Sequence, residues 1–429
     1  MASAATNAFL QAKFVSLVAR SRRLTRLTSR QLGLRAQDMP YAPSSDHFRA
    51  ANRRLAAIAR GVESRVGQLR AMWPSGDRER KLIGMAMFER EVDRARRSFG
   101  MFFEIFIQRG TSYAPVLAAH DVIAADCYAA VRAAAPEVLP SPLLKPVTYM
   151  EHGYSPSTQR RGVQMARLLG DTNPFPVIRI PWDRDNPWQS VFLHEVSHNL
   201  QADMRLWTEN QTALARRMQR IAPNPRVAQI WRRWHKEIFA DLAAILLGGP
   251  ASAAGMMTFL SHPAPRALTY RPGGAHPTGY IRAFIMSNML SRMGFADDAR
   301  DVERVWRELY DPRKGHRLPP ALLESMPRVV PHVVDEVAFQ PRLALGQRAL
   351  ADVIPFTRAD QASIRRGAIE LAAGRIPAGL PPRFMVSASG MALAMGADPD
   401  QLSQRVVAHL AAIAAASRAH STIPNRLAA

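Results

Sequence analysis

The sequence predicts a mainly α-helical protein with a small β-sheet, an α+β architecture in which helices dominate. Apolar residues recur at helical spacing over most of the chain, as in residues 46–72 and 78–109, which a Trp-Pro-Ser-Gly breaker separates. β-type runs are short and few, and the clearest covers residues 175–182, with Pro176 and Pro181 near its ends. Because proline cannot donate to a ladder, we expect this run to form a strand at the edge of a sheet.

The remaining elements follow from the same periodicity. We expect further helices over residues 114–135, 188–204, 208–221, 226–247 and 279–292, several more between 296 and 417, and a second strand over 145–150. The predicted regions are a basic N-terminal tail (1–40), a helical N-terminal region (41–140), a core (141–295) and a helical C-terminal region (296–429).

The net charge of +22 has two interpretations. A basic chain can attract an anionic surface such as nucleic acid or acidic lipid. However, only five of the 57 basic residues are lysine, and abundant arginine beside abundant alanine is typical of a GC-rich coding sequence. The arginines are also spread along the chain rather than gathered in blocks, which favours the compositional interpretation. Contact with an anionic surface through Arg-rich regions stays open, and no specific nucleic acid is predicted.

Cysteine content and hydropathy bear on the compartment. A single cysteine, Cys127, excludes an intrachain disulfide and a Cys-based zinc site, and indicates the cytoplasm or another reducing compartment. We expect no transmembrane segment, since the nearest candidate, Leu242–Leu260, contains a Gly-Gly-Pro interruption. Residues 1–37 hold seven basic residues and no acidic one. This segment is either a flexible basic tail or an amphipathic helix with a transit-type or peripheral-membrane role.

An HExxH pattern lies in the helix predicted over residues 188–204. His194 and His198 are four residues apart, so a helix places both imidazoles on one face, where they can bind one metal ion. Glu195 then lies beside the ion, where its carboxylate can act as general base toward water. The alternative is a core helix with incidental histidines. Two buried imidazoles without a ligand would leave polar nitrogens needing partners, which is energetically costly.

A second helix supplies a third ligand. Glu237 and Asp241 are also four residues apart, in an otherwise apolar helix where two carboxylates need a counter-ion. Glu237 completes a His/His/Glu set, which leaves an open coordination position. Asp241 can accept a hydrogen bond from the second ring nitrogen of a ligand histidine and so select its tautomer. His235 is the competitor for third ligand, but it lies about 200° around the helix from Glu237.

A third segment carries a histidine at a helix start. His276 precedes a proline at the beginning of the predicted helix 279–292, and Arg282 follows within it. His276 could donate to the oxyanion that forms during amide hydrolysis, with Arg282 supporting charge nearby. A loop histidine that caps a helix is an equally good interpretation. Tyr270, Tyr280 and His262 are rival oxyanion donors.

In this order, HExxH, ExxAD and HPxxxxR resemble the motifs of the gluzincin zinc peptidases. More narrowly, they are similar to those of the CAAX prenyl proteases and related membrane-associated endopeptidases. The motifs begin at His194, Glu237 and His276, and the likeness covers about residues 175–292. In that family the second motif usually reads ExEAD, whereas Phe239 stands here at the position of the inner acid.

The resemblance implies a zincin-like metallopeptidase core over residues 141–295. It also assigns His276 and Arg282 to substrate and transition-state contacts. Ser197 replaces a glycine often seen inside the zinc helix, and the expected absence of transmembrane helices differs from the membrane-embedded members.

The sequence therefore predicts a zinc metallopeptidase with one Zn²⁺ per chain and a peptide or protein substrate. Peptidases of this kind lay an extended substrate along an edge strand, a role open to residues 177–180 unless these form an ordinary strand. The alternative is a basic nucleic-acid- or anionic-membrane-binding protein with a structural or inactive metal site. Glu195 argues against it, because a structural site needs no base. A non-peptide amidase would use the same residues.

Overall fold

Helices make up 70% of the structure and strands 4%, so the predicted mainly α-helical class is confirmed. The structure is a computed structural model that describes residues 3–74, 77–141, 143–165, 172–314 and 317–422. The chain divides into two compact units, the first formed by Met1–Leu117 and Gln159–Pro176 and the second by Ala118–Thr158 and Val177–Ala429. The predicted core and C-terminal region thus belong largely to one unit.

The helices of the first unit are α1 (Ala4–Arg22), η1 (Ala36–Tyr41), α2 (Ser45–Met72), α3 (Arg78–Ile107) and η2 (Gln108–Gly110). Helix α4 (Ala114–Ala134) begins in this unit and continues into the second. The next helices of the chain, in the second unit, are η3 (Pro136–Val138), α5 (Val191–Asp203), α6 (Leu206–Ile221), α7 (Pro225–Arg233), α8 (His235–Gly248), α9 (Pro250–Leu260), α10 (Ala264–Leu268) and α11 (Gly279–Arg292). After these come α12 (Ala296–Leu309), α13 (Pro320–Val334), η6 (Asp335–Phe339), η7 (Leu343–Leu345), α14 (Leu350–Val353), α15 (Arg358–Ala372), α16 (Pro382–Ala394) and α17 (Pro399–Thr422).

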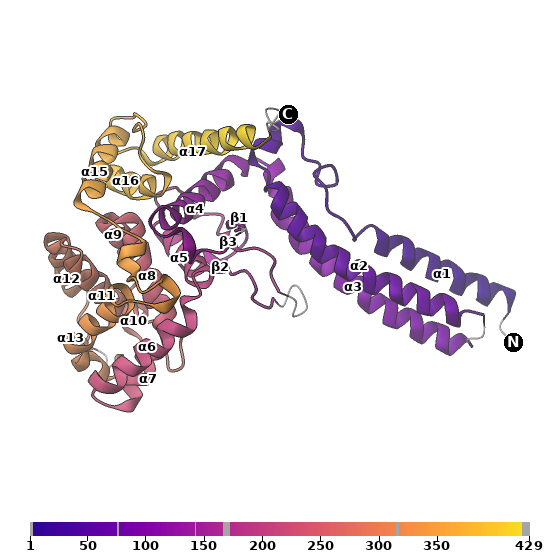
Figure 1. Cartoon of the computed structure of the whole chain (residues 1–429), viewed down its shortest axis with the longest axis horizontal. Helices are drawn as coiled ribbons and strands as arrows, with labels where there is room; N and C mark the ends of the chain where they lie inside the picture. The colour runs from indigo at the N-terminus through magenta and orange to yellow at the C-terminus, as the bar shows by residue number, and fades with distance from the viewer. Residues whose placement is uncertain (1–2, 75–76, 142, 166–171, 315–316, 423–429) are drawn as a thin grey trace. The chain divides into compact units, whose positions relative to one another are not determined.

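Three helices, α1, α2 and α3, lie alongside one another in the first unit (Figure 1). Each contributes apolar residues at helical spacing to one core, among them Leu17 of α1, Val66 of α2 and Phe88 of α3. Residues 1–40, predicted as a basic tail, therefore contain a helix whose apolar side is buried. Helix α1 can bury one side because the apolar residues between positions 9 and 18 recur at the period of a helix.

A three-stranded sheet is formed by β1 (Val147–Met150), β2 (Ser157–Gln159) and β3 (Val177–Ile180), in the order β1-β3-β2. Its residues belong to the second unit except for Gln159, the last residue of β2. Strand β3 pairs parallel to β1, with Val177 opposite Val147. The prediction that residues 177–180 form an edge strand is therefore wrong. Pro176 and Pro181 flank the strand rather than interrupt it, so the four amides between them are all able to pair.

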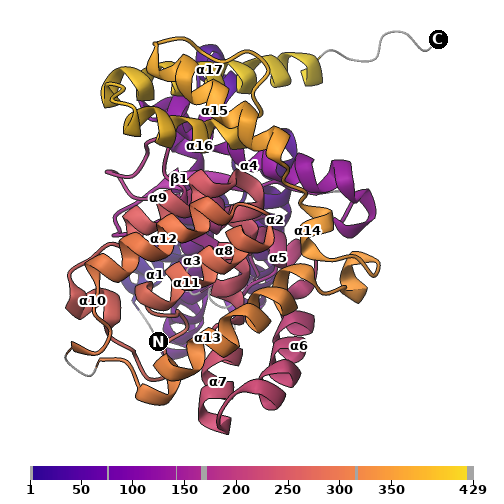
Figure 2. The same cartoon turned by 90° about the vertical axis from the view of Figure 1, so that its left-hand side faces the viewer.

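Helix α8 packs against α5, α9 and α11, and α12 and α13 pack on α11 (Figure 2). The helix predicted over 226–247 is divided at Trp234 into α7 and α8. As a result Glu237 lies in the first turn of α8. The apolar run 242–260 is also divided, because Gly249 ends α8 and α9 begins at the next residue.

Among the described residues, one helix is long and apolar enough to cross a membrane. This helix is α4, and the run 242–260 does not meet the same criteria. Within its apolar window, 61% of the residues are buried in the structure, as expected for a core helix of a folded unit. Cys127 lies in this helix and is fully buried, as is common for a free cysteine in a protein core.

Gly249 controls the angle between α8 and α9, and we predict that Gly249→Ala is strongly destabilising. Its φ of 69° and ψ of −161° belong to a region that only glycine occupies readily, and a Cβ there would overlap the ring of Phe356. Chemical denaturation should show a loss of about 3 kcal/mol, the sum of backbone strain and overpacking. Gly273 is the matched control, since its φ is 78° but a Cβ added there would have no heavy atom within 4 Å. Gly273→Ala should cost only about 1 kcal/mol, and equal losses would contradict the packing argument.

Candidate metal centre

The two helices that carry the candidate ligands, α5 and α8, pack directly on each other. Helix α5 is almost entirely buried, because the residues around its histidines are apolar or small. His194 and His198 lie one turn apart on the same side of α5, and their rings meet edge-to-face with centroids 4.7 Å apart. Helix α8 is buried on all sides and directs Glu237 toward this pair.

His194, His198 and Glu237 form a group that could hold a metal ion. One ligand atom from each of the three lies within 4.8 Å of the other two. Nε2 of His194 is 3.4 Å from Oε2 of Glu237, and Nε2 of His198 is 3.6 Å from the same oxygen. The predicted convergence of two imidazoles from one helix and a carboxylate from a later helix is therefore confirmed as a possible metal site.

The surroundings of the Glu237 carboxylate indicate whether a metal cation would fit between these residues. Oε2 is buried and has no hydrogen-bond partner among the described residues. Nevertheless three imidazole nitrogens lie around it, the third being Nε2 of His276 at 3.3 Å. A buried charged oxygen without a hydrogen bond is costly, and a cation between it and the ring nitrogens removes that cost. The donor set of two imidazoles and one carboxylate fits this interpretation.

Asp241 holds His194 from the side opposite the candidate ion. Nδ1 of His194 donates to Oδ1 of Asp241 over 2.8 Å, so the lone pair of Nε2 points to the shared position. Arg282 of α11 binds the same carboxylate through two hydrogen bonds, from Nε to Oδ2 at 2.8 Å and from Nη2 to Oδ1 at 2.5 Å. Asp241 therefore joins three helices, α5, α8 and α11, at one buried point.

The buried charges shift the pKa values of these groups. Burial raises the pKa of Glu195 to about 7, a range in which a carboxyl both takes and releases protons near neutral pH. Burial alone would lower the pKa of His194, but the carboxylates of Asp241 and Glu237 outweigh it and raise the value to about 9. Asp241 is also buried, yet the guanidinium of Arg282 outweighs that effect and holds its pKa below the ordinary value.

Three further residues were predicted as members of the site or as rivals for it, and their surroundings differ from one another. His276 lies at the centre, with its side chain 66% exposed, so it faces the open side of the group. Arg282 is buried, and its guanidinium is bound to the carboxylate of Asp241. His235, the rival third ligand, instead packs edge-on against Trp207 and lies outside the metal-binding group.

The rival oxyanion donors, Tyr270, Tyr280 and His262, contact residues other than the three candidate ligands. Tyr270 packs against Trp234, and His262 is bound to Tyr154. Tyr280 lies on a face of α11 roughly opposite to Arg282, because two residues correspond to about 200° of helix rotation.

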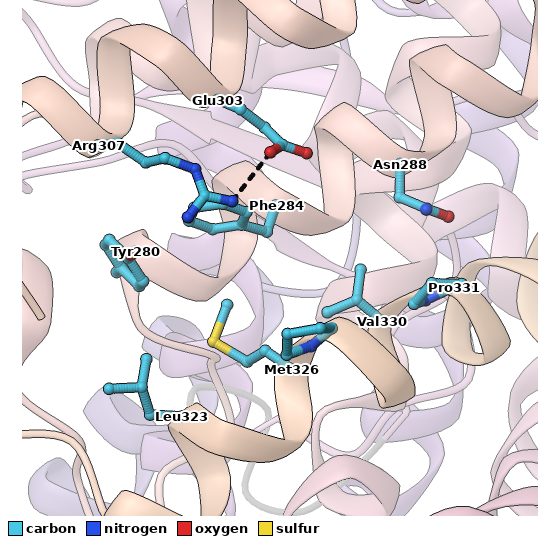
Figure 3. Close-up of a pocket in the computed structure, with 10 residues that line it drawn as sticks. Tyr280, Phe284, Asn288, Glu303, Arg307, Leu323, Met326, Val330 and Pro331 are labelled. Carbon is cyan, nitrogen blue, oxygen red and sulfur yellow. Dashed lines mark hydrogen bonds and ion pairs between the residues drawn. The ribbon is translucent and has the colours of Figure 1, made fainter.

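That opposite face of α11 lines a groove of about 300 Å³ between α11, α12 and α13 (Figure 3). Phe284 and Asn288 share this face with Tyr280, and Arg307 of α12 covers the ring of Phe284 at 4.6 Å while pairing with Glu303 at 3.0 Å. None of the three candidate ligands lines the groove, so it is separate from the metal-binding group.

One element near the site has no signal in the sequence. Strand β2 reads Ser-Thr-Gln, which is too short and too polar to show a β pattern. In the structure, Oγ1 of Thr158 donates to the carbonyl of Val177 over 3.2 Å, and Nδ2 of Asn199 donates to Thr158 Oγ1 over 2.6 Å. The backbone of Thr158 also hydrogen bonds to the Glu195 carboxyl. These contacts bring β2 to helix α5, and only the tertiary fold reveals them.

Comparisons of this chain with protein-family models, with curated proteins and with solved structures find no match. The function is therefore inferred from the residues of the site and their geometry.

We predict that the purified chain binds one Zn²⁺ and that Asp241 strengthens this binding. Glu237→Ala should abolish stoichiometric binding, because one of three ligands is lost. Asp241→Asn should weaken binding about 10–100-fold, since the amide keeps the shape but no longer favours the Nδ1–H tautomer of His194. Mass-spectrometric metal analysis and competition with a chromogenic chelator measure both effects.

Asp297→Asn is the matched control, because Asp297 is an exposed residue of α12 paired only with Arg300. Each variant is first compared with the unmodified chain by circular dichroism, so that loss of the fold is separated from loss of the ion. Full zinc content in folded Glu237→Ala would contradict the assignment of the third ligand.

Proposed function

We propose that this chain is a zinc-dependent peptidase in which His194, His198 and Glu237 hold one Zn²⁺ and Glu195 is the general base. The observation that carries the proposal is the buried Oε2 of Glu237, which has three imidazole nitrogens within 3.6 Å but no well-aligned hydrogen bond from any residue that the structure describes. A set of two imidazoles and one carboxylate matches the ligands that zinc takes in hydrolytic sites, where one position stays open for water or substrate.

Zinc in this position would supply Lewis-acid chemistry, by polarising a substrate carbonyl and by making water more acidic. Glu195 follows His194 along α5, so its carboxylate lies beside the ligands and not among them. We infer that it removes a proton from the attacking water and later gives that proton to the leaving amine. A purely structural ion would require no carboxylate at this position, which favours hydrolysis over a structural role.

His276 is the residue best placed to stabilise the negative oxygen that develops on the substrate carbonyl. Its Nε2 lies 3.3 Å from Glu237 Oε2, and most of its side chain is open to solvent. From this position the ring N–H of His276 can donate a hydrogen bond to the oxygen of the substrate carbonyl, on the solvent-exposed side of the three candidate ligands. Arg282 acts through Asp241 on the orientation of His194, and so contributes to positioning.

The sheet limits where an extended peptide could bind. Both sides of β3 are occupied, so residues 177–180 cannot pair with a substrate as the sequence suggested. A peptide that adds to this sheet would have to pair at β1 or β2. Thr158 of β2 contacts Glu195, and we therefore infer that β2 is the edge nearer to the reacting groups.

We predict that Glu195→Gln retains one Zn²⁺ but loses peptidase turnover by about 10²–10⁴-fold, the range contributed by general acid–base catalysis. The substitution keeps the size of the side chain and removes its ability to accept a proton. Turnover is measured with a peptide library derived from a proteome digest, and zinc is measured on the same preparation. Glu303→Gln, on α12 in the separate groove, is the control and should leave turnover unchanged. Full activity of Glu195→Gln would contradict the proposed mechanism. If the unmodified chain cleaved only non-peptide amides, it would be an amidase and not a peptidase.

A second candidate role concerns the first unit and is favoured by its charge. Met1–Leu117 and Gln159–Pro176 together hold 24 Lys and Arg against 10 Asp and Glu, a net +14, whereas the rest of the chain has 33 against 25. Basic residues are therefore denser in the first unit than in the rest of the chain, although they form no continuous block. Several apolar side chains on α1 and α3 are exposed beside these cations, among them Phe9 (65%) and Ile83 (53%). We propose that this unit contacts an anionic membrane surface, where cations and apolar side chains both bind.

This role predicts binding of the full chain to vesicles that contain phosphatidylglycerol, with little binding to pure phosphatidylcholine vesicles. Binding should fall steeply as NaCl rises from about 50 to 200 mM, because the surface charge is screened. Co-sedimentation measures the bound fraction. Phe9→Ser should weaken vesicle binding without changing the charge, and tighter binding to duplex DNA than to the anionic vesicles would favour nucleic acid instead.

A further inference from the structure

A cluster of cations around one aromatic ring lies outside the metal-binding group. The guanidinium carbon of Arg266 is 4.2 Å from the centre of the Tyr154 ring, and that of Arg184 is 5.1 Å from the same centre. The hydroxyl of Tyr154 is 3.0 Å from Nε2 of His262. Three basic side chains of the second unit, Arg184 from one segment and His262 and Arg266 from another, thus meet at a single tyrosine.

No carboxylate in the part of the chain that the structure describes balances the charge of this cluster. Among the described residues, no ion pair joins an acidic group to Arg184 or Arg266, although Asp183 and Asp185 flank Arg184 along the chain. Nε of Arg184 is buried and lacks a hydrogen-bond partner. Burial and the two nearby guanidinium groups lower the pKa of His262, which favours its neutral form. Like charges held together in this way repel one another, and a bound anion would relieve that repulsion.

The cluster is held in place by the protein before any ligand binds. Phe259 of α9 packs against Tyr154, with ring centroids 6.3 Å apart, and Arg184 lies 5.5 Å from the Phe259 ring. The hydroxyl of Tyr310 donates to the backbone carbonyl of His262 over 2.7 Å. A neutral His262 that accepts from Tyr154 at Nε2 keeps an N–H donor at Nδ1. The guanidinium groups add donors in the planar arrangement that suits a carboxylate.

Helix α9 connects this cluster to the metal centre. Met256 contacts Nη2 of Arg282, the residue that holds Asp241, and Phe259 follows less than one turn later. On the other side, Gly279 at the start of α11 lies so close to backbone carbonyls of α9 and α10 that a Cβ would be 3.4 and 3.6 Å from them. His276 is three residues before Gly279. The end of α9 is therefore bordered by the cationic cluster and by the segment that carries His276.

We propose that Tyr154, Arg184, His262 and Arg266 form a subsite that binds a carboxylate of the substrate. The subsite would select peptides with an acidic side chain or a free C-terminal carboxylate near the bond that is cleaved. This inference rests on the proposed peptidase function for its biological meaning, but the binding of a carboxylate can be tested separately.

The test uses the full-length Glu195→Gln chain loaded with Zn²⁺, so that bound peptides stay intact. Fluorescein-labelled hexapeptide pools of mixed sequence are compared by fluorescence anisotropy. One pool carries a single Glu and a C-terminal amide, one replaces that Glu by Gln, and one has no acidic side chain but a free C-terminal carboxylate. We expect one of the two carboxylate-containing pools to bind about tenfold more tightly than the Gln pool, because charge-assisted hydrogen bonds are lost in the latter. The preferred pool identifies the source of the carboxylate.

Two pairs of substitutions give the matched comparison. Arg184→Gln with Arg266→Gln should abolish the preference, whereas Arg216→Gln with Arg220→Gln, on the exposed side of α6, removes the same charge and should retain it. Arg266→Gln alone, at an exposed residue, is the fallback if the double variant does not fold, and it should reduce the preference several-fold. Equal binding of all pools by the Glu195→Gln chain, or an unchanged preference in the folded Arg184/Arg266 variant, overturns the subsite.

The same pools incubated with the unmodified zinc-loaded chain test the enzyme separately. A carboxylate preference without any cleavage would contradict the peptidase and leave the binding site standing. Cleavage without a preference would contradict the subsite alone.

Discussion

The carboxylate of Asp241 is the interaction on which the candidate centre depends. It is fully buried in α8, accepts from His194 of α5, and is bound at both oxygens by Arg282 of α11. A buried carboxylate that lost either partner would be left with unpaired charge, so the three helices are coupled at this point. The tautomer of His194, the direction of its Nε2 and the packing of α5 on α8 all follow from the same contact.

The helices around this contact are closely packed. The ligands lie on two helices that are buried on almost every side, and Gly249 allows α8 to turn directly into α9 against Phe356. Helix α9 then brings Met256 to Arg282 and leads to the cationic cluster. A ligand set supported by packed helices keeps its geometry better than one on loops. The open side is left to His276, which lies just before α11 and is largely exposed.

The sequence predicted those parts of the site that depend on local spacing. His194 and His198, or Glu237 and Asp241, share a helix face by periodicity alone, and apolar neighbours indicate burial. The ion pair of Arg282 with Asp241 was not predicted, because it depends on the packing of two helices and the paired residues are 41 positions apart in sequence. The central place of residues 177–180 in the sheet was missed for a similar reason. Strand β2 is recognised only through its pairing with β3, and three polar residues carry no pattern of their own.

Charge balance gives a further reason to expect a divalent ion. The buried side chains at the centre include three carboxyl groups, Glu195, Glu237 and Asp241, against one guanidinium, Arg282, so full ionisation of these groups leaves an excess of two negative charges. The partly exposed Lys236, with Nζ 4.0 Å from Oε1 of Glu237, offsets this excess only in part. In the absence of an ion, two protons can supply the balance, and the raised pKa values of His194 and Glu195 indicate where they bind. A divalent cation bound to the two imidazoles and Glu237 would displace both protons and neutralise the same charge. Glu195 would then be ionised and free to accept a proton, which is the state that a general base requires.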